Sequence, residues 1–73
     1  MKPGDLRRFN DTLGVDVALV LTLAGCTFVV LEVNHNPAEA RGGSVKLLID
    51  GRVDEGWSRL WVLENSEVIS EAR

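Results

Sequence analysis

The chain of 73 residues contains one cysteine, one histidine and no tyrosine. A single cysteine, Cys26, cannot form an intrachain disulfide, which excludes a disulfide-stapled secreted scaffold. One cysteine and one histidine also cannot supply the four ligands of a structural zinc site. A core of this size rarely contributes more than roughly 3–5 kcal/mol of net stability. We therefore expect support from tight packing or from another chain, by self-association or within an assembly.

Long apolar runs and strong charge of one sign are also missing. The longest apolar stretch, from Val17 to Leu23, is interrupted by Thr22 and is far too short to cross a bilayer. The start of the chain shows no leader pattern, so we expect a cytoplasmic protein with no membrane partner. The net charge of −3 disfavours broad contact with nucleic-acid phosphates.

Patterns of known catalytic or cofactor chemistry are not found. His35 lies in a polar loop, and Cys26 has no basic residue beside it to activate the thiol. Gly42-Gly43 lacks the spacing and the following lysine of a phosphate-binding loop. Asp54 and Glu55 would point to opposite faces of a strand, as solvated charges rather than a facing pair. We expect no enzyme, no metal, no cofactor and no small-molecule substrate.

Alternating apolar residues predict most of the strands. The clearest case is Val15–Leu23, where every odd position is apolar and falls on one face. Asp50-Gly51 is a strong hairpin signal, so the chain from Arg52 should run back antiparallel to the strand before it, whose Val45, Leu47 and Ile49 should face inward. The remaining predicted strands are short and rich in β-branched or apolar residues: Leu6–Phe9, Thr27–Val33, Ser44–Ile49 and Glu67–Ser70.

Two segments are ambiguous. Asn36 before Pro37 is a good helix start, and the loop 36–42 could contain one short helical turn. In Trp57–Leu63 the residues Trp57, Leu60 and Trp61 have helical spacing, but Gly56 weakens a helix there. The preceding hairpin favours a strand for this segment.

These patterns predict one all-β domain over residues 1–73, built as a small barrel of five to six antiparallel strands. A resemblance to known proteins rests on five stretches of the sequence: Lys2-Pro3-Gly4-Asp5-Leu6, Leu13-Gly14, Asp50-Gly51-Arg52-Val53, Trp61-Val62 and the end from Ser66 to Arg73. On them the chain resembles small uncharacterised Src-homology-3-like (SH3-like) proteins of bacteriophages, cyanophages among them. Residues 24–43 have no counterpart in that pattern. The resemblance implies an SH3-like barrel and a phage origin, with the host cytoplasm or the virion as location.

Two sets of residues are candidates for partner contact. Trp57 and Trp61 are the first, because tryptophan is enriched at the energetic centres of interfaces. The alternative is that both fill the core; we expect one of them in the core and the other as a contact residue. Lys2, Arg7 and Arg8 are the second, as a small basic patch on the first strand. The leading hypothesis is a non-enzymatic protein-interaction module, as a phage accessory or virion-associated structural protein. The alternative is a nucleic-acid-associated modulator of transcription or translation that uses the basic strand.

Overall fold

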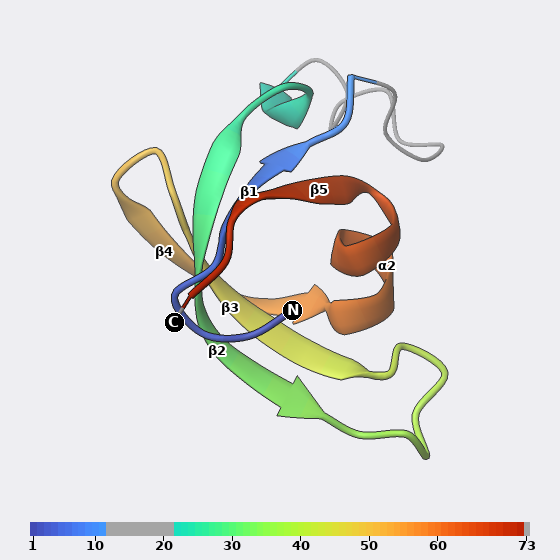
Figure 1. Cartoon of the computed structure of the whole chain (residues 1–73). Helices are drawn as coiled ribbons and strands as arrows, with labels where there is room; N and C mark the ends of the chain where they lie inside the picture. The colour runs from blue at the N-terminus through green and yellow to red at the C-terminus, as the bar shows by residue number, and fades with distance from the viewer. Residues whose placement is uncertain (12–21, 73) are drawn as a thin grey trace.

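The computed structural model describes residues 1–11 and 22–72. Its elements are β1 (Leu6–Phe9), β2 (Thr27–His35), β3 (Gly43–Ile49), β4 (Arg52–Ser58), α2 (Arg59–Glu64) and β5 (Ser66–Ser70). The five strands form one antiparallel sheet in the order β4-β3-β2-β1-β5. The predicted all-β class is therefore confirmed. The sheet curves strongly without closing, as in a small β-barrel left open at one seam, and α2 connects its two edge strands, β4 and β5 (Figure 1).

The core lies on the concave side of this sheet. Seven buried apolar side chains form it: Phe9, Phe28, Val30, Val45, Leu47, Ile49 and Val62. Alternation places Val45, Leu47 and Ile49 of β3 inward, as predicted from the sequence. Val62 comes from α2, so the short helix contributes directly to the core.

Two β-bulges bend the sheet at the level of Lys46. Leu31 is the extra residue on β2, between the pairs Val30–Leu47 and Glu32–Lys46. On β4, Glu55 and Gly56 together lie opposite Lys46, and Gly56 has φ of +82°, a conformation that favours glycine. Because a bulge bends a strand and increases its twist, this pair lets a five-stranded sheet wrap around a small core.

The predicted hairpin is present between β3 and β4. Ile49 pairs with Arg52, and the two turn residues have positive φ, 52° for Asp50 and 78° for Gly51. Positive φ at both positions is the geometry of a type I′ turn, whose twist matches that of the flanking strands.

Three of the predictions for individual segments need correction. Thr22 and Leu23, the end of the strand predicted for Val15–Leu23, are helical, and the rest of that range lies outside the described residues. The strand predicted for Trp57–Leu63 ends at Ser58, and α2 follows. Ser58 ends the strand because its hydroxyl accepts the N–H of Trp61, 3.3 Å away, and so caps the helix.

The third correction concerns the loop 36–42, which contains successive turns rather than a helical turn. Asn36 still acts as expected of a capping residue, since its side-chain oxygen accepts the N–H of Ala38 at 3.1 Å. The N–H of Gly42 then bonds to the carbonyl of Glu39, and the N–H of Glu39 to that of Asn36.

A buried carboxylate joins the two ends of the described chain. Asp5, 3% exposed, accepts the backbone N–H of Ala72 at 2.7 Å and that of Lys2 at 3.0 Å. The bond from Ala72 is the main reason that the pKa of Asp5 lies below its ordinary value; burial opposes it, and the N–H of Lys2 adds to it. A carboxyl with a depressed pKa stabilises the fold at neutral pH and loses this contribution as the pH falls below about 4.

We expect Asp5→Asn to lower the free energy of unfolding at pH 7 by about 1–3 kcal/mol, because it removes the charge that receives both N–H groups. At a pH of about 2.5 the difference from the parent chain should shrink, since the unfolded chain then binds a proton at Asp5 that the folded chain, with its lowered pKa, binds less readily. Urea unfolding at the two pH values measures this. The exposed Asp11→Asn serves as the control and should have little effect at either pH. A destabilisation by Asp5→Asn that is equal at both pH values contradicts the expectation.

Candidate interaction surface

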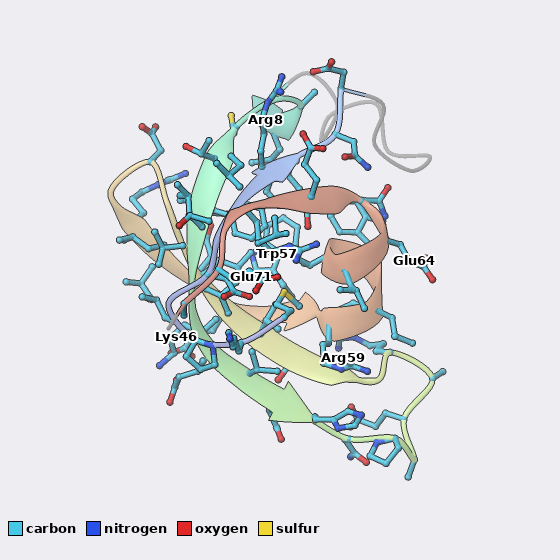
Figure 2. All side chains as sticks on the ribbon, viewed as in Figure 1. Arg8, Lys46, Trp57, Arg59, Glu64 and Glu71 are labelled. Atoms are coloured by element: carbon cyan, nitrogen blue, oxygen red, sulfur yellow. The ribbon has the colours of Figure 1, made fainter. Side chains whose placement is uncertain are left out.

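The two tryptophans lie together where β4 passes into α2. Trp57 is near the end of β4 and Trp61 is in the first turns of α2. Their ring centroids are 5.7 Å apart, and both rings also approach Phe9, at 5.9 and 6.0 Å. Both are half-buried and pack against the core. Figure 2 shows Trp57 on the concave side of the sheet.

The sequence left open whether one tryptophan fills the core while the other faces a partner. In the structure each tryptophan packs against the core and also retains an accessible surface. We call Trp57 and Trp61 the tryptophan pair. The pair lies at the open seam, since Trp57 is on an edge strand and Trp61 is on the helix that leads to the other edge strand.

Two hollows adjoin the tryptophan pair. The first, the tryptophan hollow, measures about 410 Å³ and is lined by Glu55, Gly56, Trp57, Ser58 and Trp61. The second, the hairpin hollow, measures about 710 Å³ and lies between the β3–β4 hairpin and the segment 22–27. Leu23, Cys26, Ile49, Asp50, Arg52, Asp54 and Trp57 are among its lining residues. Trp57 therefore contributes to both hollows.

The bulge in β4 determines which side chains face the hairpin hollow. Arg52, Asp54 and Trp57 pair with Ile49, Leu47 and Val45, which are buried. Since directly paired residues share a face, the concave face of β4 carries Arg52 and Asp54 before the bulge and Trp57 after it. Polar side chains thus occupy the inner side of this strand at the end near the hairpin.

The outer face of β4 carries a separate ion-pair cluster. The ammonium of Lys46 lies 2.6 Å from a carboxylate oxygen of Glu32 and 3.1 Å from one of Glu55. These hydrogen bonds, that of Glu32 first, raise the pKa of Lys46. Glu55 is therefore engaged across the strand, whereas Asp54 and Asp50 make no ion pair within the described part of the chain.

The predicted basic patch is not assembled as one accessible surface. Arg7 is buried, 6% exposed, and donates to the hydroxyl and the carbonyl of Ser66, both at 2.9 Å. Arg8 is partly exposed, but its guanidinium pairs with Asp11 at 3.4 Å and Glu67 at 3.9 Å. Of the three residues, Lys2 alone is exposed with no ion pair among residues 1–11 and 22–72.

The buried guanidinium of Arg7 also contacts the carboxyl end of α2. A further contact reaches the carbonyl of Leu63 at 3.5 Å, and the hydroxyl of Ser66 in turn donates to the carbonyl of Val62. Arg7 thus places a positive charge at the carboxyl end of α2, where the helix carbonyls lack partners within the helix.

Within residues 1–11 and 22–72, no group of three or more His, Cys, Asp or Glu side chains is placed to hold a metal ion. None of the helices in that part of the chain is long and apolar enough to cross a membrane. Comparisons with known proteins give no assignment: no family model, no curated protein and no solved structure matches the chain.

Sequence reasoning missed the acidic residues beside the tryptophan pair. The sequence pattern predicts Asp54 as a solvated charge on a regular strand, because it does not account for the bulge that fixes the direction of this side chain. The available signal was Gly56, since a glycine inside a strand often marks a bulge.

Replacement of the buried Arg7 tests its structural role. We expect Arg7→Met to lower the free energy of unfolding by roughly 2–4 kcal/mol, because the carbonyls of Ser66 and Leu63 lose their donor inside the protein. The matched variant Arg8→Gln removes an exposed arginine of the same strand and should cost no more than about 1 kcal/mol. Urea unfolding measures both. Equal losses for the two variants contradict the assignment.

Proposed function

We propose that the protein is a non-enzymatic interaction module that binds a segment of another protein at the tryptophan pair. The observation that supports this most is the accessible aromatic surface at the open seam of the sheet. Two half-buried tryptophans there line two adjoining hollows instead of being sealed inside.

Tryptophan suits this role because its large rigid ring gives much contact area for little loss of conformational freedom. The pair is also held in place: Trp57 and Trp61 contact each other and Phe9, which is fully buried. A partner would therefore meet a surface that is already ordered, which lowers the entropic cost of binding.

The loop 36–42 supports the same surface from outside the sheet. The guanidinium of Arg41 donates to the carbonyl of Gly56, and the N–H of Leu60 donates to the carbonyl of Arg41 at 3.1 Å. Arg59 donates to the carbonyl of Gly42 at 2.7 Å, and Figure 2 shows Arg59 on the side of α2 toward this loop. These bonds fix the junction of β4 and α2, where the tryptophan pair lies.

A nucleic-acid role through the first strand has less support, because Arg7 is buried and Arg8 is paired with two carboxylates. A virion-associated partner follows from the resemblance to phage proteins alone and stays a prediction, as does self-association.

The test compares Trp57→Phe and Trp61→Phe, which keep an aromatic ring but shorten the accessible surface. We expect each to lower stability by about 1 kcal/mol and to reduce capture of partner proteins from extracts of the source cells at least about tenfold. Thermal unfolding and quantitative mass spectrometry measure the two effects. Val53→Ala, at an exposed position that pairs with Leu48 on the outer face of the sheet, is the control and should leave capture unchanged. Lower stability with undiminished capture in both tryptophan variants would exclude this surface.

A further inference from the structure

The hairpin hollow combines an apolar floor with carboxylates that lack partners. Asp54 is half-buried on the concave face of β4 and makes no hydrogen bond or ion pair through its side chain within the described residues. Asp50 is exposed at the rim and is equally unpaired there. Arg52 is the cationic side chain among the lining residues, so the lining carries two carboxylates against one guanidinium.

The floor of this hollow suits a long aliphatic stem. Leu23, Cys26 and Ile49 line it, and Ile49 belongs to the core. Lysine and arginine side chains bury their methylene groups along such surfaces while their charged ends reach polar groups. Trp57 adds an indole ring to the lining, and tryptophan is the aromatic side chain with the strongest attraction for a cation.

We infer that the hairpin hollow takes a lysine or arginine side chain of the partner segment, with its stem on Leu23 and Ile49 and its charge between Trp57 and Asp54. The inference rests on the proposed function and adds the chemistry of the partner. It uses charge complementarity: Glu55 is already engaged by Lys46, whereas Asp54 and Asp50 are unpaired, so the lining keeps a net negative charge beside Arg52 and Trp57. The overall net charge of −3 favours the same kind of partner at long range.

Positively charged side chains lie at the other end of the seam, near α2. Arg41 and Arg59 bond to backbone carbonyls and make no ion pair within the described chain. An acidic segment bound near α2 is therefore the competing outcome that the experiment has to separate from a basic one.

The experiment selects binders from a displayed library of random peptides, about 12 residues long, on the full chain at low salt. Cys26 lines the hairpin hollow and is the only cysteine of the chain, so its rate of alkylation by iodoacetamide reports occupancy of that hollow. Peptides that slow this alkylation should be rich in Arg or Lys. Replacing the responsible arginine by citrulline, which keeps the shape and removes the charge, should weaken binding about tenfold.

Variants of the chain complete the test. Asp54→Asn should weaken the arginine peptide about fivefold and the citrulline peptide less than about twofold, because only the charged peptide interacts with the carboxylate. Asp50→Asn should have a smaller effect of the same kind, and it keeps a favourable Asn-Gly turn. Glu64→Gln is the control, since Glu64 is exposed and Figure 2 shows it pointing outward from α2; it should change neither affinity.

The outcomes distinguish the two proposals. Peptides that protect Cys26 and lose affinity in Trp57→Phe, yet carry neutral or acidic residues and ignore Asp54→Asn, overturn the basic ligand and leave the proposed function standing. A selection in which no peptide depends on Trp57 or Trp61 overturns both.

Discussion

The buried guanidinium of Arg7 is the contact on which the open architecture most depends. It lies on β1, next to the edge strand β5, and bonds to the end of α2 and the start of β5, more than 50 residues further along the chain. Because β4 and β5 are not joined by a strand ladder, α2 must be fixed by other means. Arg7 fixes its carboxyl end, Ser58 caps its first turn, and Val62 anchors its middle in the core.

Much of the fold was predictable because local chemistry and tertiary structure agree there. The turn at Asp50-Gly51, the inward residues of β3 and the short strands β1 and β5 all follow from alternation and turn preference. The segment from Trp57 is different, since a strand and a helix meet inside it. Ser58 is the local signal of that change, since serine is a favoured helix N-cap, whereas the prediction rested on the hairpin and counted Gly56 against a helix.

The candidate site was predictable only in part. The tryptophans could be chosen from their chemistry, but the burial of Trp57 depends on the register of β4, which one bulge shifts, and that of Trp61 on the helix α2, which was not predicted. The basic strand shows the same limit. Arg7 and Arg8 are adjacent and alike in sequence, and alternation places one inside and the other at the surface. A charge on a short strand therefore cannot be assigned to a binding surface until the strand's inward face is known.

The bulge at Glu55–Gly56 has a consequence for how this protein can change. It puts the two halves of β4 out of phase, so that Asp54 and Trp57 share a face although three positions separate them. Loss of either Glu55 or Gly56 would restore strict alternation and leave Arg52, Asp54 and Trp57 on the concave face, since each would keep its present partner on β3. The strand would lose its bend, but the side chains that face the hollow would be the same. A single codon deletion at this point would thus alter the curvature of the sheet while keeping the chemistry of the surface.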